Sequence, residues 1–268
     1  MDEKVKAFLL VSDDNYMKGL IAQINSIQKN FNKYKIYILH SLSQENLNFI
    51  RKEIYKEKKF DDFLFKHIND KKGHITKLNF GKFMPDFIEE DNFFYMDTDV
   101  IILKNFEWEF PKTISCASRI IDTKNEEKYG ESIKLMQEFV IKNKGIIEKD
   151  NNIKIFLDGS FFANKEWFIK ELRPQIIEAS NKMPQGVKHW YGLGFFNAAL
   201  DILKRPVEEW KLKQILTTFD KSYNLGNYHL IHFLGKEKPW LTSKTDFSEV
   251  WKENYLNGIL NGEEYEKV

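Results

Sequence analysis

The sequence predicts an α/β fold with a mainly parallel central sheet and a helical extension at its C-terminal end. Short apolar runs alternate with segments whose apolar residues recur every three or four positions, as strands and amphipathic helices do. The 268 residues are 42% hydrophobic and 15% aromatic, which suffices for a large core. No repeat, low-complexity tract or clear linker divides the chain. We therefore expect a single domain over residues 1–268.

The first half alternates strand and helix most regularly. A polar loop of helix-capping residues at 12–15 follows the first apolar run, and Ser43 caps a later helix. Pro85 is expected to kink or break the helix in which it lies. Strands are expected at 5–11, 36–39, 63–68 and 93–103, and helices at 16–30, at 43–54 and at 75–88.

The second half is less regular. Asp158-Gly159-Ser160 interrupts an apolar run, and residues 189–194 form an aromatic loop with two glycines. Pro174 leaves the helix around it uncertain. Strand-like runs are expected at 153–163 and 228–234, and helices at 131–142, 167–180, 195–203 and, around Phe247 to Tyr255, near the end.

The charge balance gives no sign of two classes of partner. The net charge is +1, from 41 basic and 40 acidic residues that are well mixed, so no strong field favours nucleic acid or an anionic membrane. A single cysteine, Cys116, fits a reducing compartment. The first residues are charged, and no apolar run approaches the roughly 20 residues of a membrane span. We expect a cytoplasmic protein, with peripheral attachment to a membrane as the alternative.

Two carboxylates lie inside the most apolar run of the chain. Asp97 and Asp99 stand between Phe93–Met96 and Val100–Leu103. Positions i and i+2 of an extended chain point to the same side, so the two side chains could converge on one cation. Carboxylate oxygens suit Mg²⁺ or Mn²⁺. The alternative, a pair of Asp residues capping a turn at a strand end, is disfavoured because the residues that follow are apolar.

A histidine near the C-terminal end offers a third ligand. His232 lies in an apolar run before Gly235 and Lys238. A glycine permits close approach of the backbone, and a lysine is a point charge suited to phosphate. Imidazole beside two carboxylates favours Mn²⁺ over Mg²⁺. The alternative for His232 is a hydrogen-bonded core residue.

The loop after the first strand could contact a nucleoside. Asp13 and Asn15 can form hydrogen bonds with a base or ribose, and Tyr16 can stack on it, although simple helix capping explains the same residues. Lys77 and Lys82 precede the acidic pair and could reach a diphosphate. From the residues alone, each of these lysines is more simply explained as part of the solvated surface, because the chain is rich in lysine.

Four segments in this order resemble glycosyltransferase family 8, which includes glycogenin and bacterial lipopolysaccharide galactosyltransferases. They are SDDNY at 12–16, ITKL at 75–78, FYMDTDVI at 94–101 and HFLGKEKPW at 232–240. The acidic pair alone is a weak signal, but its combination with H-x-x-G-x-x-K-P-W is specific. The resemblance covers roughly residues 5–255. It implies a GT-A fold, which is Rossmann-like, with a nucleotide-binding half at 1–105 and an acceptor-side half with a closing segment at 106–268.

The resemblance also implies roles for individual residues. The chain would transfer a hexose from a UDP-sugar to a carbohydrate, glycan or protein acceptor, with retention of anomeric configuration and with Mn²⁺, or Mg²⁺ as the alternative ion. Mn²⁺ would be held by Asp97, Asp99 and His232, the diphosphate by Gly235, Lys238 and Lys77, and the rest of the nucleotide-sugar site by Ser12, Asp13, Asn15, Tyr16 and Thr98.

The chain departs from the family pattern at two places. Asp158-Gly159-Ser160 stands where the family has Asn-Ser-Gly or Asn-Ala-Gly. The segment 192–197 lacks both acids of a family Asp-Gln-Asp run that precedes a helical asparagine. Asp158 is then the remaining anionic candidate beside the sugar, where a carboxylate would stabilise an oxocarbenium-like transition state. We therefore predict Asp158 and Lys77 as catalytic residues.

Two other functions stay open at this stage. A non-catalytic nucleotide-sugar-binding module would explain the missing acids, although the whole metal set is retained. A phosphatase or phosphotransferase of the haloacid dehalogenase type also carries an acidic pair after a strand. That class needs a second acidic pair downstream, and none with the required Gly-Asp pattern follows residue 99. Incubation with UDP-sugars and Mn²⁺ distinguishes these hypotheses.

Overall fold

The computed structural model describes most of the chain and groups it into two units. Unit 1 comprises Met1–Asp61, Phe93–Glu109 and Lys211–Val268, and unit 2 comprises Asp62–Asn92 and Phe110–Trp210. Each unit draws on separate stretches of sequence. The described residues are 5–50, 55–59, 80–122, 147–148, 152–182, 191–204, 207–217, 223–235, 238–242 and 245–256.

Unit 1 is built on a parallel sheet, as predicted. β1 (Lys6–Asp13) pairs in parallel with β2 (Tyr34–Ser41) on one side and with β4 (Asn92–Met96) on the other. β3 (Tyr55–Lys59) continues the sheet beyond β2, also in parallel. The central strand β1 is apolar and buried over nearly its whole length. Parallel strands with both faces covered have this composition.

A second, smaller sheet lies in the same unit. β11 (Leu230–His232) pairs in parallel with β10 (Gln214–Leu216) and antiparallel with β5 (Val100–Ile102). β5 and β4 are therefore neighbours in sequence but belong to different sheets. β10 was not expected, because its three residues are too few to show a period.

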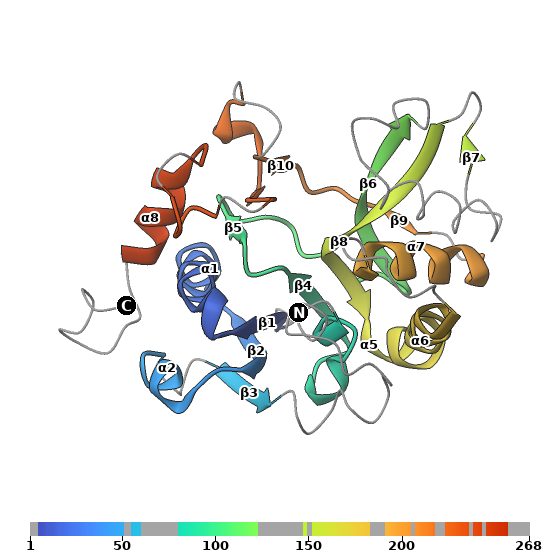
Figure 1. The fold of residues 1–268 in the computed structure, drawn as a ribbon, viewed down its shortest axis with the longest axis horizontal. Helices are drawn as coiled ribbons and strands as arrows, with labels where there is room; N and C mark the ends of the chain where they lie inside the picture. The colour runs from blue at the N-terminus through green and yellow to red at the C-terminus, as the bar shows by residue number, and fades with distance from the viewer. Residues whose placement is uncertain are drawn as a thin grey trace. The chain divides into compact units, whose positions relative to one another are not determined.

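Helices pack on these strands. α1 (Met17–Asn30) contacts β1, β5 and the C-terminal helix α8 (Ser248–Leu256), as can be followed in Figure 1. Both helices were expected. The helix expected at 43–54 ends early, because α2 covers only Gln44–Asn48 and Tyr55 already begins β3. β3 is polar at most positions because it lies at the edge of the sheet, where most of its side chains are exposed, and its pattern did not indicate a strand.

Unit 2 contains a mainly antiparallel group of strands. β6 (Ile114–Asp122) pairs antiparallel with β8 (Asn152–Asn164), and β7 (Ile147–Glu148) pairs antiparallel with β8. The two-residue β9 (Glu208–Glu209) pairs in parallel with β6. β6 was not expected.

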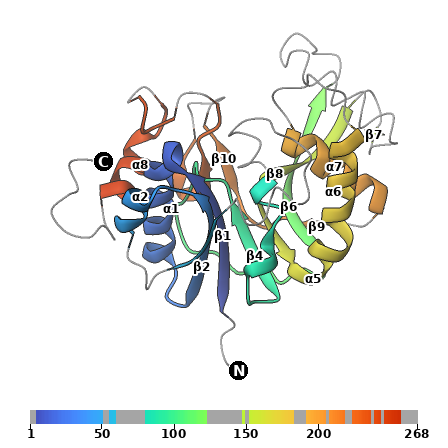
Figure 2. The same ribbon diagram turned by 60° about the horizontal axis from the view of Figure 1, so that its bottom comes forward.

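Two helical segments cover the strands of unit 2. α6 (Arg173–Lys182) and α7 (Tyr191–Leu203) contact each other, and α7 also contacts β8 (Figure 2). A short α5 (Lys165–Trp167) and a π-helical turn at Phe168–Leu172 precede α6. Pro174 therefore does not break the helix. The wider turn directly before it accommodates a residue that cannot donate to the preceding turn.

Four further expectations meet different outcomes. α7 begins at Tyr191, so residues 191–194, which were expected in a loop, form its first turn. The break expected at Pro85 is present as a short 3₁₀ helix at Pro85–Phe87. The strand expected at 63–68 and the helix expected at 131–142 lie outside the described residues. Within the described part of the chain, no helix has both the length and the apolar character of a membrane span.

Candidate functional site

The acidic pair lies in a turn and not within one continuous strand. β4 ends at Met96 and β5 begins at Val100, with the Val100 amide donating to the Asp97 carbonyl at 3.0 Å. The prediction of a strand through both carboxylates is therefore wrong. The apolar residues after the turn are buried because β5 enters the second sheet. A run of apolar residues is equally compatible with one long strand and with two strands in different sheets.

Close packing of α1 holds this turn in place. A Cβ atom at Gly19 would lie 2.7 Å from the Thr98 carbonyl oxygen and 2.9 Å from the Trp240 ring. Only glycine allows the helix to approach so closely, since real Cβ contacts are not this short. In addition, Gln23 on the same helix donates to the Asp97 carbonyl at 2.7 Å. The backbone of the turn is thus fixed from one side by α1.

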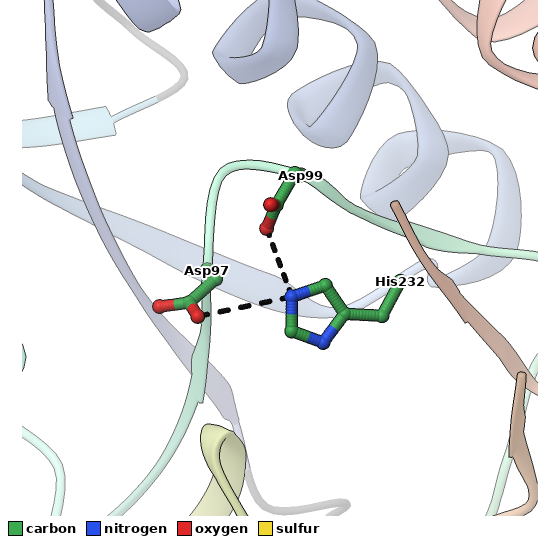
Figure 3. A group of neighbouring side chains, drawn as sticks. All are labelled: Asp97, Asp99 and His232. Atoms are coloured by element: carbon green, nitrogen blue, oxygen red, sulfur yellow. Dashed lines mark ion pairs between the residues drawn. The ribbon is translucent and has the colours of Figure 1, made fainter. Parts of the chain in front are cut away.

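The turn brings both carboxylates to the histidine at the end of β11. As Figure 3 shows, Asp97 and Asp99 both point toward Nε2 of His232. The distance from that nitrogen is 3.1 Å to Asp99 Oδ1 and 3.9 Å to Asp97 Oδ2. One ligand atom from each of the three residues lies within 4.8 Å of the others. The structure therefore brings together the three metal ligands predicted from the sequence.

The other polar atoms of the same three side chains have partners of their own. The Tyr95 hydroxyl donates to Asp97 Oδ1, and Lys238 Nζ donates to Asp99 Oδ2. His232 Nδ1 faces Gln214 Nε2 at 3.0 Å. Each ligand is thereby oriented from outside, and the three atoms that converge are the ones these contacts leave facing inward. Ligands held by outer groups in this way are typical of metal centres.

Asp99 is ionised in this environment. Burial by itself raises the pKa of a carboxyl group, but His232 and Lys238 beside Asp99 outweigh burial and hold its pKa well below its usual range. With Asp97, the cluster contains two carboxylates and one lysine around a neutral or charged imidazole. A neutral imidazole leaves one negative charge that is not balanced within the cluster.

The donor set fits a divalent cation. Two carboxylate oxygens and one imidazole nitrogen suit Mn²⁺, and two carboxylates suit Mg²⁺. Asp97, Asp99 and His232 would hold such an ion through one ligand atom each.

The loop after β1 is built around a helix cap. Asp13 is buried, and its Oδ1 accepts hydrogen bonds from the amides of Asn15 at 3.0 Å and Tyr16 at 3.2 Å. The Ser12 hydroxyl, also buried, donates to the Asp13 carbonyl at 3.3 Å. The capping interpretation of Asp13 is thus confirmed. Asn15 is exposed, and burial raises the pKa of the half-buried Tyr16.

The segment after β11 shows why its glycine and lysine occur where they do. Gly235 has φ 91°, a left-handed conformation that side chains other than glycine rarely adopt. Lys238 is buried and also donates to the Phe233 carbonyl at 2.8 Å. Trp240 packs edge-to-face on Tyr16, with ring centroids 5.8 Å apart. The segment therefore contacts Asp99 through Lys238 and the loop after β1 through Trp240.

Asp158 in unit 2 has a different environment. Its Oδ2 lies 2.6 Å from Lys82 Nζ, and the side chains are 13% and 3% exposed. Lys82 is therefore buried in an ion pair, which corrects the expectation of solvated surface. Asp158 lies in β8 where the pairing with β6 is irregular, because five steps from Phe156 to Phe161 oppose two steps from Ser118 to Cys116. Irregular strands often redirect side chains near functional sites.

Asn197 of α7 holds this part of β8. Its Oδ1 accepts from the Phe156 amide at 2.7 Å, and its Nδ2 donates to the Phe156 carbonyl at 2.9 Å. The helical asparagine recognised in the sequence thus has a structural role that does not require the missing acids. Lys77, predicted as catalytic and diphosphate-binding, lies outside the described residues.

Sequence reasoning missed four residues that support the cluster. Tyr95 could have been found, because it precedes Asp97 by two positions and so shares its side of an extended chain. Gln23 is fully buried in the apolar stripe of α1, and a polar residue in such a stripe is a usable signal. Gly19 and Gln214 gave no signal, since their roles depend on segments distant in sequence.

Solved structures with a similar fold are glycosyltransferases. The galactosyltransferase LgtC, in complex with donor and acceptor sugar analogues, has a TM-score of 0.69 and 14% identity, with 97% of this chain and 99% of LgtC covered. The bifunctional glycosyltransferase WbbM has a TM-score of 0.65 and 16% identity, with 96% of this chain and 50% of WbbM covered. These comparisons confirm the expected GT-A fold.

The sequence identifies the family within this fold. The model of glycosyl transferase family 8 matches residues 8–244, and the chain belongs to that family. It is 23% identical over 273 residues to the glycosyltransferase GlyD of Streptococcus pneumoniae serotype 4 (strain ATCC BAA-334 / TIGR4), with 92% of this chain covered. The chain spans only 30% of the length of GlyD. The family resemblance noted in the sequence is therefore confirmed.

Proposed function

We propose that the chain is a metal-dependent glycosyltransferase that transfers a hexose from a UDP-sugar to a carbohydrate, glycan or protein acceptor, with retention of anomeric configuration. The observation that carries the proposal is the convergence of Asp97, Asp99 and His232 at the end of β4 in a chain of family 8. Ligands of open α/β sheets bind beyond the carboxyl ends of the strands, and this cluster lies at such an end.

Mn²⁺ is the proposed ion, because an imidazole nitrogen joins two carboxylate oxygens in the donor set. Asp97, Asp99 and His232 would hold it. A bound divalent ion acts as a Lewis acid for the negative charge that appears on the departing diphosphate. Lys238 adds a fixed positive charge next to Asp99, where the same negative charge would be stabilised. Mg²⁺ is the alternative ion.

The loop after β1 is proposed to bind the nucleoside. β1 and β4 are parallel neighbours, with Leu10 opposite Met96, and β1 continues three residues further, to Asp13. The loop after β1 and the turn that carries Asp97 and Asp99 therefore follow neighbouring strands of one sheet. Since the Asp13 carboxylate already caps the first turn, Asn15 and the ring of Tyr16 are the groups best suited to contact uridine.

Asp158 remains the proposed carboxylate beside the donor sugar, and Lys77 a proposed cation for the diphosphate. The irregular pairing of β8 supports the first proposal, because it provides a reason for an acidic side chain in an apolar strand. The ion pair with Lys82 tempers its expected effect. A carboxylate that keeps its lysine stabilises a developing positive charge less than an isolated one would.

Binding of UDP tests the proposed site directly. Titration of UDP into the protein with Mn²⁺ should show at least about tenfold higher affinity than with the metal chelated, because an ion held by Asp97, Asp99 and His232 would supply positive charge for the diphosphate. Asp97→Asn should abolish that difference, whereas Asp91→Asn, which removes an exposed carboxylate, should leave it intact. Equal affinity with and without metal in the wild type would contradict the proposal.

Activity is tested separately with a panel of UDP-sugars. Release of UDP with at least one donor in the presence of Mn²⁺ is the expected result, and NMR of the product should show the anomeric configuration of the donor. Asp158→Asn should reduce transfer with UDP affinity changed only a few-fold, and the reduction should be smaller than the roughly 10²–10³-fold effect of an unpaired carboxylate, because Lys82 offsets part of its charge. An inverted product would contradict the assignment of retention. UDP binding without any transfer would favour a nucleotide-sugar-binding module instead.

A further inference from the structure

We propose that Gln214 is a positioning residue of the metal centre, whose amide oxygen accepts a hydrogen bond from Nδ1–H of His232, so that the lone pair of Nε2 faces the ion. The inference rests on the proposed metal site. It concerns a side chain that contacts none of the ligand oxygens in the described contacts and that acts only through the histidine ring.

The strand register places the two side chains on one face. In the parallel pair of β10 and β11, Leu216 lies opposite His232, and Gln214 lies opposite Leu230. Gln214 is therefore the diagonal neighbour of His232, two positions along the strand, and a long side chain can span that distance. The observed separation between Gln214 Nε2 and His232 Nδ1 is 3.0 Å.

Both the backbone carbonyl and the Nδ1 atom of His232 have partners, whereas Nε2 faces the carboxylates. Its carbonyl oxygen accepts from both the amide and the hydroxyl of Thr217, at 3.2 Å each. Gln214 contacts one ring nitrogen, and the other ring nitrogen faces Asp99 and Asp97. The backbone contacts fix the position of the residue, and the contact with Gln214 fixes the rotation of the ring about its side-chain bonds.

The chemistry of imidazole makes the identity of residue 214 important. A neutral ring carries one N–H and one lone pair, and a metal ligand must direct the lone pair at the ion. If Nε2 binds the ion, Nδ1 carries the hydrogen and needs an acceptor. An amide can provide one, because rotation by half a turn exchanges its NH₂ group for its carbonyl oxygen. Glutamate provides only acceptors. Methionine has a similar size but provides no hydrogen-bond donor and only a weakly accepting sulfur.

These differences predict the behaviour of two variants toward Mn²⁺ alone, without nucleotide. Gln214→Met should lower Mn²⁺ affinity by about tenfold to a hundredfold, the usual effect of losing an outer partner of a ligand. Gln214→Glu should bind Mn²⁺ at least as tightly as the wild type. Electron paramagnetic resonance of free Mn²⁺ measures both. The matched control is Gln44→Met, which removes an exposed glutamine of α2 and should leave affinity unchanged.

A double-mutant cycle separates positioning from a general structural role. In a His232→Ala background, Gln214→Met should change Mn²⁺ affinity by less than about twofold, because the ring through which it acts is gone. An undiminished loss in that background would overturn the proposal, as would equal losses in Gln214→Met and Gln214→Glu. Unchanged affinity in Gln214→Met would overturn it as well. No Mn²⁺ binding by the wild type would instead reject the metal centre of the proposed function.

Discussion

The two units each bury a carboxylate next to a lysine, but the two arrangements differ. In unit 1, Asp99 pairs with Lys238 and shares His232 with a second carboxylate, Asp97. In unit 2, Asp158 faces Lys82 at 2.6 Å, one charge of each sign. The first arrangement has an excess of acidic groups around a common point. The second is balanced within itself.

Because of this difference, the cluster in unit 1 should attract a cation, whereas the Asp158–Lys82 pair in unit 2 already combines one charge of each sign. Two carboxylates that converge repel each other unless a cation lies between them, so the cluster in unit 1 gains free energy when a divalent ion binds. A one-to-one buried pair gains nothing from a further cation, and removal of either partner leaves the other charge buried without that contact. Removal of a carboxylate should therefore lower the stability of unit 2, whereas in unit 1 it should mainly weaken binding of a cation.

The largest expected effect is on the stability of unit 2. Asp158→Asn preserves shape but removes the carboxylate that lies 2.6 Å from the buried Lys82, which should lower the free energy of unfolding by about 3–5 kcal/mol. Urea denaturation measures the loss. The control is Asp86→Asn, whose partner Arg173 forms an ion pair with side chains 28% and 17% exposed, and its expected cost is nearer about 1 kcal/mol.

A second variant keeps this prediction testable if Asp158→Asn does not fold. Lys82→Met combined with Asp158→Asn removes both charges and should recover most of the lost stability, because apolar or neutral replacements of a buried pair are often tolerated. Equal stability of the single and double variants would contradict the interpretation of the pair as self-contained.

The next effect concerns stabilisation by the ion. At a Mn²⁺ concentration of about 100 times Kd, binding to the native state alone should add about 2.7 kcal/mol to the free energy of unfolding. Thermal unfolding with and without Mn²⁺ should show this gain in the wild type and in the double variant of unit 2. It should disappear in Asp97→Asn, whose side chain is 30% exposed and is therefore expected to fold normally. A gain that survives in Asp97→Asn would place the ion elsewhere.

A smaller effect distinguishes Lys238 from an ordinary surface lysine. Lys238→Ala should weaken UDP binding by roughly 1.5–3 kcal/mol, the contribution of a charge-assisted contact, and leave uridine almost unaffected. Calorimetric titration of both ligands measures the difference. Lys29→Ala is the control, because Lys29 pairs with Glu253 at the exposed surface. Equal losses for UDP and uridine would indicate a structural role of Lys238.

The smallest effect tests how tightly the metal turn is packed. Gly19→Ala places a methyl group against the Thr98 carbonyl and the Trp240 ring, and overpacking of this kind typically costs about 1–3 kcal/mol. Mn²⁺ affinity should fall with it, since the turn carries both aspartates. Gly226→Ala is the matched control. Its nearest contact would be the side chain of Asn224 at 3.2 Å, which can move. No difference between the two variants would mean that the turn tolerates displacement.

Much of this fold was predictable because its signals are local. The apolar run of β1 and the helical period of α1 depend on neighbouring residues, and both elements occur where the sequence predicted them. The short strands β9 and β10 were missed, since two or three residues show no period and form only when a partner strand is present. Residues Phe93–Leu103 were predicted as one strand because burial, not strand continuity, determines apolar composition.

The sequence by itself determined the family, the α/β fold class and the identity of the three candidate metal ligands. Those follow from residue type and order, which Asp97, Asp99 and His232 retain whatever the path of the chain between them. Only the tertiary structure decided how the three converge, through a turn between two sheets that α1 approaches closely at Gly19. It also decided that Lys82 neutralises Asp158 and that Gln214 contacts His232. Pairings between residues far apart in sequence depend on the packing of whole elements, and no local pattern encodes them.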